Sequence, residues 1–92
     1  TPITTEAPME KLYCAPNPFG ESTELVFQLE QEDWVTISIF DASGRLLSTE
    51  QLYFDAGLQR YQVDSELLTE SGVYTCRVQS SDRAGTVRML KQ

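Results

Sequence analysis

The chain has 92 residues, with seven basic against fourteen acidic side chains, which gives a net charge of −7. This length fits one small domain, and 40% hydrophobic with 10% aromatic residues is enough for a packed core, which excludes disorder. The acidic balance excludes a nucleic-acid-binding protein, because phosphate contacts need clustered basic residues. No apolar run approaches the roughly 18 residues of a membrane span. No secretory signal opens the chain either, so we expect any export signal to belong to a longer precursor.

The first nine residues differ in character from the rest. Residues 1–9 are rich in Thr and Pro and lack hydrophobic alternation, so they are predicted to be a linker from a preceding domain. One domain is predicted from residue 10 to residue 92. Its first strand covers residues 12–14 and ends at the Pro-Asn-Pro-Phe sequence of residues 16–19, because proline lacks an N–H and disfavours helix in the preceding residue. We expect an edge strand and then a rigid corner with Phe19 packed beneath it.

The rest of the chain alternates apolar and polar residues with a period of two. This pattern runs through five segments between residues 24 and 89 and is typical of half-buried strands in antiparallel sheets. No stretch has the i, i+3, i+4, i+7 stripe of an amphipathic helix. The expected core consists of Leu25, Phe27, Val35, Ile37, Ile39, Tyr61, Tyr74, Cys76 and Val78.

Polar residues and glycines separate these segments. In Asp41-Ala42-Ser43-Gly44 the aspartate can start a type I turn and the glycine can take the left-handed position after it, which closes a hairpin. Residues 30–33 and 79–84 are predicted to be further turns. Short strands with such turns predict an all-β fold, an immunoglobulin-like antiparallel β-sandwich of about seven strands.

Charge is unevenly distributed along the chain. The last sixteen residues have four basic and one acidic side chain, a net charge of +3, whereas the remainder has three basic and thirteen acidic side chains, a net charge of −10. A terminal strand over residues 86–90 is expected at a sheet edge, where unpaired backbone groups can accept a partner strand. Two interpretations of Arg88 and Lys91 stay open: a solvated face, and a basic patch that meets a partner.

The two cysteines, Cys14 and Cys76, also leave two interpretations open. In an exported chain a disulfide between them is permitted and would stabilise the fold by about 4 kcal/mol on the chain-entropy model. The alternative is two small buried apolar side chains that never meet. The sequence does not give the Cα separation of about 4–7 Å that a disulfide needs. A zinc site is not expected, because two cysteines without a histidine do not supply four ligands.

Catalysis is not expected either. The chain has no histidine, so it has no Ser–His or Cys–His pair, and neither cysteine lies in an evident basic setting. The neighbouring carboxylates Glu32 and Asp33 belong to a polar turn, where solvation explains them. No glycine-rich phosphate loop is present. The sequence therefore predicts a protein that is not an enzyme and needs no cofactor.

Four short segments follow one another along the chain, before a basic closing strand: Ala15 to Phe19, Leu25 to Leu29, Val35 to Arg45, and Ser71 to Tyr74. In this order they resemble the type A C-terminal sorting domain of the type IX secretion system, over about residues 11–91. The sorting-motif residues that the resemblance implies are Pro16, Asn17, Pro18, Phe19, Asp41, Gly44, Arg45, Gly72, Tyr74, Arg88 and Lys91. Arg88 departs from a lysine of the family but keeps its charge, and Val63 stands at a tryptophan-like position.

The resemblance also implies a route and partners. Cargo of this system enters the periplasm by an ordinary signal peptide, and the folded sorting domain directs it across the outer membrane to the cell surface or the exterior. A shuttle β-barrel then carries it to a sortase, which cuts upstream of the domain. The implied partners are this shuttle, the sortase and the parent cargo domain.

Two other functions stay open. Trp34 and Phe40 lie opposite the apolar face of their segment, as Tyr13 does in the first strand, and aromatic residues on an outer sheet face bind glycans or proteins in adhesion modules. The second alternative is a sorting domain that is retained on a surface component of the secretion machinery.

Overall fold

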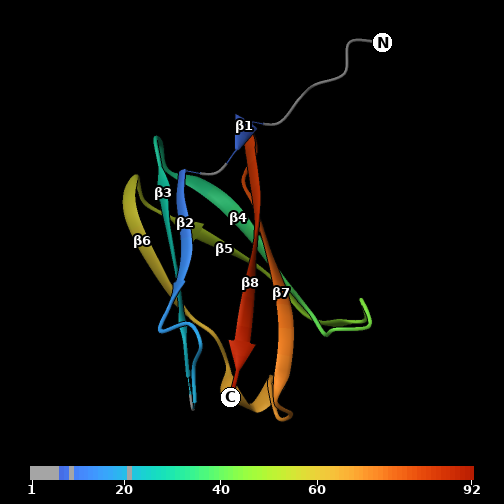
Figure 1. Cartoon of the computed structure of the whole chain (residues 1–92). Helices are drawn as coiled ribbons and strands as arrows, with labels where there is room; N and C mark the ends of the chain where they lie inside the picture. The colour runs from blue at the N-terminus through green and yellow to red at the C-terminus, as the bar shows by residue number, and fades with distance from the viewer. Residues whose placement is uncertain (1–6, 9, 21) are drawn as a thin grey trace.

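The computed structural model describes residues 7–8, 10–20 and 22–92, which form strands joined by short turns (Figure 1). The elements are β1 (Ala7–Pro8), β2 (Glu10–Ala15), β3 (Glu24–Leu29), β4 (Asp33–Phe40), β5 (Leu46–Phe54), β6 (Gly57–Gln62), the 3-10 turn η1 (Ser65–Leu67), β7 (Gly72–Gln79) and β8 (Arg83–Lys91). The linker predicted over residues 1–9 lies outside the described residues, except for β1. Within the described part of the chain, no helix is long and apolar enough to cross a membrane.

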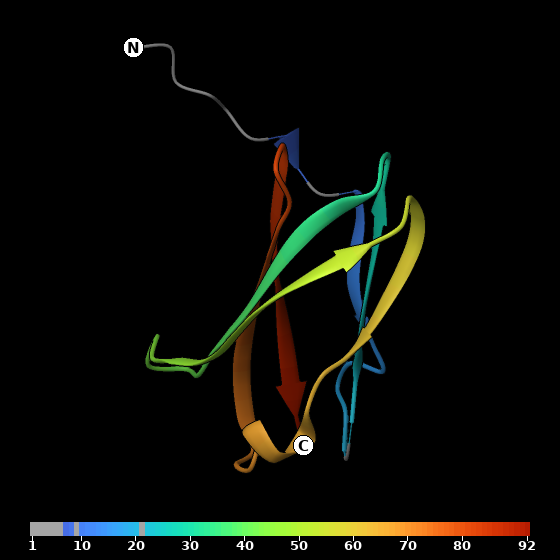
Figure 2. The ribbon, with the colours of Figure 1, turned by 180° about the vertical axis from the view of Figure 1, so that it is seen from behind.

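The strands form two sheets that lie face to face (Figure 2). The larger sheet has the order β1-β8-β7-β4-β5 and the smaller sheet the order β2-β3-β6. Strands β2 to β8 pair antiparallel, and the two-residue β1 pairs parallel with β8. Seven antiparallel strands in two sheets confirm the predicted all-β sandwich. The likeness to immunoglobulin domains stays a prediction.

The core lies between the two sheets, because alternate side chains of each strand point inward. Eight of the nine predicted core side chains are buried, and Tyr61 is partly buried against them. The rings of Phe27 and Phe54 meet edge to face, with their centroids 5.1 Å apart. The core cluster also includes Cys14, Phe19, Leu29, Val63, Leu68 and Met89.

The edge of β8 differs from the prediction. The strand begins at Arg83 instead of residue 86, and its first residues pair with β1, which places Ala7 opposite Arg83 and Pro8 opposite Ala84. The corner after β2 covers the other end of β8 through an isolated bridge between Phe19 and Lys91. Both ends of β8 therefore have a neighbour, but among the described residues β1 pairs with Arg83 and Ala84 alone, so the prediction of an edge strand over residues 86–90 is narrowed at its end and is not overturned.

Candidate functional site

The sequence motifs gather at one end of the sandwich. In both views the corner after β2, the start of β7 and the end of β8 lie at the end opposite to β1 (Figures 1 and 2). The turn between β4 and β5 projects toward the same end. We call this region the motif end; it consists of residues 16–19, 41–45, 68–74 and 88–92. Residues far apart in the sequence meet there, and the contacts described below hold them together.

The side chain of Asn17 takes the place of a neighbouring strand along β8. Its Nδ2 donates a hydrogen bond to the carbonyl oxygen of Arg88 at 2.9 Å, and its Oδ1 accepts one from the backbone N–H of Leu90 at 2.9 Å. A carboxamide suits this role because it carries a donor and an acceptor, as a peptide group does. The flanking peptide bonds, Ala15–Pro16 and Asn17–Pro18, are both cis.

Phe19 continues this pairing with its backbone and anchors it with its ring. Its N–H donates to the carbonyl oxygen of Leu90 at 2.9 Å, and its carbonyl accepts from the N–H of Gln92 at 2.9 Å. The ring is 1% exposed and belongs to the core cluster, as predicted. The corner and the C-terminal strand therefore form one folded unit.

Lys91 has a structural role in addition to its charge. Its backbone pairs with Gly72, and its Nζ donates a hydrogen bond to the carbonyl oxygen of Leu68, so the side chain is partly buried. Arg88 differs, because its side chain is exposed on the outer face of β8. The two terminal cations are therefore not equivalent, although the sequence alone does not distinguish them.

Tyr74 closes the loop before β7. It is 6% exposed, and its hydroxyl donates to the carbonyl oxygen of Glu70 at 2.7 Å and accepts from the N–H of Glu70 at 3.2 Å. The ring is thus buried while its polar atom is satisfied at the rim. Gly72, two residues earlier, has a φ of +140°, which side chains other than glycine rarely adopt.

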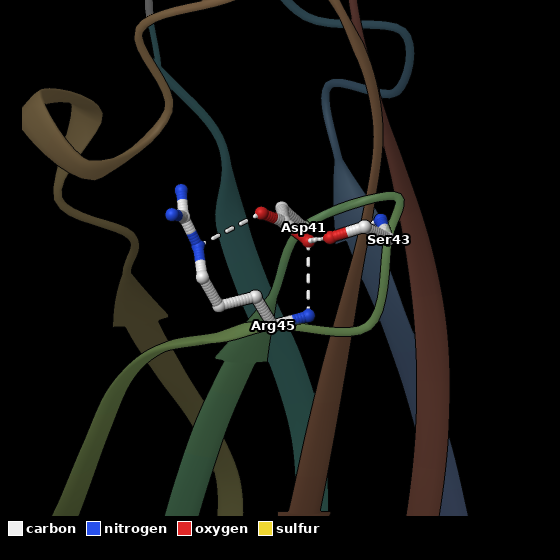
Figure 3. A network of polar contacts seen from close by, with 3 residues as sticks. All are labelled: Asp41, Ser43 and Arg45. Atoms are coloured by element: carbon white, nitrogen blue, oxygen red, sulfur yellow. Dashed lines mark hydrogen bonds and ion pairs between the residues drawn. The ribbon is translucent and has the colours of Figure 1, made fainter.

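The turn between β4 and β5 is organised by one carboxylate (Figure 3). Oδ1 of Asp41 accepts bonds from the hydroxyl of Ser43 at 2.6 Å, the N–H of Ser43 at 2.9 Å and the N–H of Arg45 at 3.0 Å. Its Oδ2 lies 3.2 Å from Nε of Arg45. Gly44 occupies the predicted left-handed position, with a φ of +90°.

These bonds predict how Asp41 titrates. The hydroxyl of Ser43 and the N–H of Arg45 hold the pKa of Asp41 below its ordinary value of 3.8. Because the folded pKa is lowered, the stability that Asp41 contributes is present above pH 3.8 and is lost as the pH falls through the folded pKa. In a carbon NMR titration we expect Ser43→Ala to raise the pKa of Asp41 and to leave that of Asp33 unchanged. An unchanged pKa of Asp41 in this variant would show that Ser43 does not hold the carboxylate.

Two shallow hollows flank Tyr74 at the motif end. One, of about 170 Å³, lies between the turn of Asp41 and the loop of residues 70–74, and the other, of about 120 Å³, lies between Asp41, Arg45 and Tyr74. A third hollow, of about 130 Å³, lies at the opposite end between residues 29–33 and 80–83 and has no motif residue in its lining. Of these three hollows, the two that motif residues line therefore both lie at the motif end.

Comparison with protein families identifies the arrangement. The family model described as "Secretion system C-terminal sorting domain" matches residues 11–92, which is most of the chain. The chain belongs to this family of sorting domains. No curated protein and no solved structure matches the chain significantly.

Membership of the family makes this chain a type IX secretion sorting signal. A sorting domain implies a cargo upstream, the secretion system as its partner, and export to the cell surface or the extracellular space.

The structure adds residues of the motif end that sequence reasoning missed. Thr23 is 1% exposed, and its hydroxyl donates to the carbonyl oxygen of Pro16 at 2.8 Å. The carbonyls of Leu68 and Glu70 hold Lys91 and Tyr74. Backbone acceptors leave no residue-type signal, so no sequence pattern points to them.

The two cysteines of the sorting domain are free thiols in the structure. Both are buried and belong to the same core cluster. Burial raises the pKa of the Cys14 thiol to about 11 and that of the Cys76 thiol to about 12. The disulfide that the sequence left open is not formed between them in this structure.

This state of the cysteines predicts their reactivity. At pH 8 we expect the folded domain to react slowly with a thiol reagent, because both thiols are buried and protonated. In denaturant without reductant, mass spectrometry should find both Cys14 and Cys76 labelled. Absence of label on both residues in that denaturant would instead show a bridge.

Proposed function

We propose that the domain is a non-catalytic export signal that is read in its folded state at the motif end. Cargo that carries it passes through the periplasm, a shuttle β-barrel of the outer membrane receives the motif end, and a sortase then removes the domain. The observation that carries the proposal is the convergence of the motifs. Asn17 and Phe19 bond to a strand more than seventy residues away in sequence, and that strand pairs with Gly72.

The geometry supports reading of a folded unit better than reading of a linear peptide. The backbone groups of Leu90 are engaged by Asn17 and Phe19, so they are not available to a receptor strand. What the motif end presents outward is side chains, among them Arg88 and Arg45. Side-chain charges on a rigid surface give a partner both orientation and rate of encounter.

Arg88 provides the test of this proposal. We expect Arg88→Ala, in the domain fused behind a periplasmic reporter, to lower the surface-exposed fraction of reporter by about tenfold, as the loss of a charged contact does. Its melting temperature should stay close to that of the unchanged domain, because exposed side chains change stability by only about 0.5 kcal/mol.

Arg60→Ala is the matched control. Arg60 is also an exposed strand arginine, but it lies in β6 of the smaller sheet, 3.9 Å from Glu24. The control should be delivered normally. If the surface-exposed fraction of reporter is the same for Arg88→Ala as for Arg60→Ala, the result would contradict a role of Arg88 in recognition. The molecular mass of the surface reporter tests the sortase step. We expect the mass of the reporter alone, because the sortase removes the domain. A reporter that still carries the domain at the surface would mean that the domain is retained.

A further inference from the structure

Among the described residues, no carboxylate lies on the outer face of the larger sheet as its strand register defines it, although the chain has fourteen acidic residues. Cross-strand pairs share a face of a sheet, so the register of β4, β5, β7 and β8 defines this face. Its side chains are those of Trp34, Thr36, Ser38, Phe40, Leu46, Thr49, Gln51, Tyr53, Val73, Thr75, Arg77, Gln79, Ala84, Thr86, Arg88 and Leu90.

Two arginines give this face its charge. Arg88 lies opposite Thr75, and Arg77 is two residues further along β7, so the two are diagonal neighbours about 7–8 Å apart. Both side chains are exposed. Among the described residues, no hydrogen bond or ion pair holds either guanidinium. Their charges are therefore available to a partner.

Apolar side chains lie beside the arginines. Val73 and Leu90 form a cross-strand pair and are 40% and 43% exposed. Phe40 lies opposite Thr75 on the other side of β7. We call the group of Phe40, Val73, Arg77, Arg88 and Leu90 the arginine face. Its apolar side chains form the centre and its two arginines carry permanent positive charge. This combination is typical of protein–protein interfaces, where arginine is enriched.

The far corner of the same sheet face has a different character. Trp34 and Tyr53 stack edge to face there, with ring centroids 5.4 Å apart. Partial desolvation raises the pKa of Tyr53, whose side chain is half exposed, and the nearby Glu32 raises it further. Negative charge thus lies beyond this corner, and the positive charge of the face is confined to its β7–β8 half.

We propose that the arginine face docks a protein of the export machinery whose surface presents carboxylates around an apolar centre, an inference that rests on the proposed function. Charge complementarity carries the argument. The domain has a net charge of −7, so an acidic partner is repelled by most of its surface and attracted at this face. Arg77 belongs to none of the sorting motifs, so the inference extends recognition beyond them.

Arg77→Glu in the reporter fusion tests the inference. Because like charges across an interface are strongly unfavourable, we expect a loss of surface delivery of about tenfold or more. The matched control is Arg60→Glu, which makes the same change of charge on the opposite sheet and should be delivered within about twofold of the unchanged domain. Circular dichroism verifies folding, and if Arg77→Glu does not fold, Arg77→Gln replaces it, with a smaller expected loss.

The outcomes separate the two proposals. If the unchanged domain is not delivered, the proposed function fails and the inference falls with it. If the unchanged domain and Arg77→Glu are delivered equally, only the inference is overturned. Arg77-dependent binding of the purified domain to phosphatidylglycerol vesicles or to a surface polysaccharide would also overturn it, because the ligand would then not be a protein.

Discussion

Deletion of residues 89–92 is expected to unfold the domain at physiological temperature. Met89 has no exposed surface, and loss of a buried side chain of this size costs about 2–5 kcal/mol. The deletion also removes the bonds of Leu90 and Gln92 to Asn17 and Phe19, each worth about 0.5–1.5 kcal/mol. The total is a large part of the roughly 5–14 kcal/mol that stabilises a domain of this size. Thermal melting should show a fall of about 20 °C or more.

Deletion of Gln92 alone is the control for this experiment. It removes one hydrogen bond, to the carbonyl of Phe19, so we expect a cost of about 1 kcal/mol. If the longer deletion melts within a few degrees of the intact domain, the corner and β8 do not form the unit described above. Because the longer deletion is expected to unfold the domain, its failure to be exported would not show that residues 89–92 are recognised. The Arg88→Ala variant is expected to stay folded, so its failure to be exported would show that Arg88 is recognised.

Phe19→Ala should produce the second large effect. The ring is 1% exposed in the core, and truncation of a buried phenylalanine costs about 3–5 kcal/mol. We expect a melting temperature lower by about 15–30 °C. The loss should also free the end of β8, which amide hydrogen exchange at Gln92 reports, since this N–H donates to Phe19.

The control for Phe19→Ala is Leu58→Ala. The side chain of Leu58 is 52% exposed on β6, so its truncation should change stability by about 0.5 kcal/mol or less. A similar loss for both variants would mean that the ring of Phe19 does not anchor the corner.

Much of the fold could be predicted because its determinants are local. The alternation through Val35, Ile37 and Ile39 specifies which face of β4 is buried, and all three side chains are at most 1% exposed. The turn from Asp41 to Gly44 was predictable for the same reason, since its bonds join residues within four positions of one another.

What could not be predicted depends on contacts between distant segments. The side-chain bonds of Asn17 to β8 span 71 and 73 residues, and nothing local distinguishes this asparagine from one in an ordinary turn. Pairing of β1 with β8 is equally non-local, so the cover that β1 gives to Arg83 and Ala84 could not be predicted.

The central claim is that this folded domain is an export signal in its own right. The most direct measurement is the surface-exposed fraction of a periplasmic reporter that carries residues 1–92 at its C-terminus, compared between a host with the type IX secretion system and the same host without it. We predict surface reporter only in the host that has the system, and periplasmic reporter in the other. Reporter that stays in the periplasm of both hosts, with the domain folded as limited proteolysis would show, would contradict the claim.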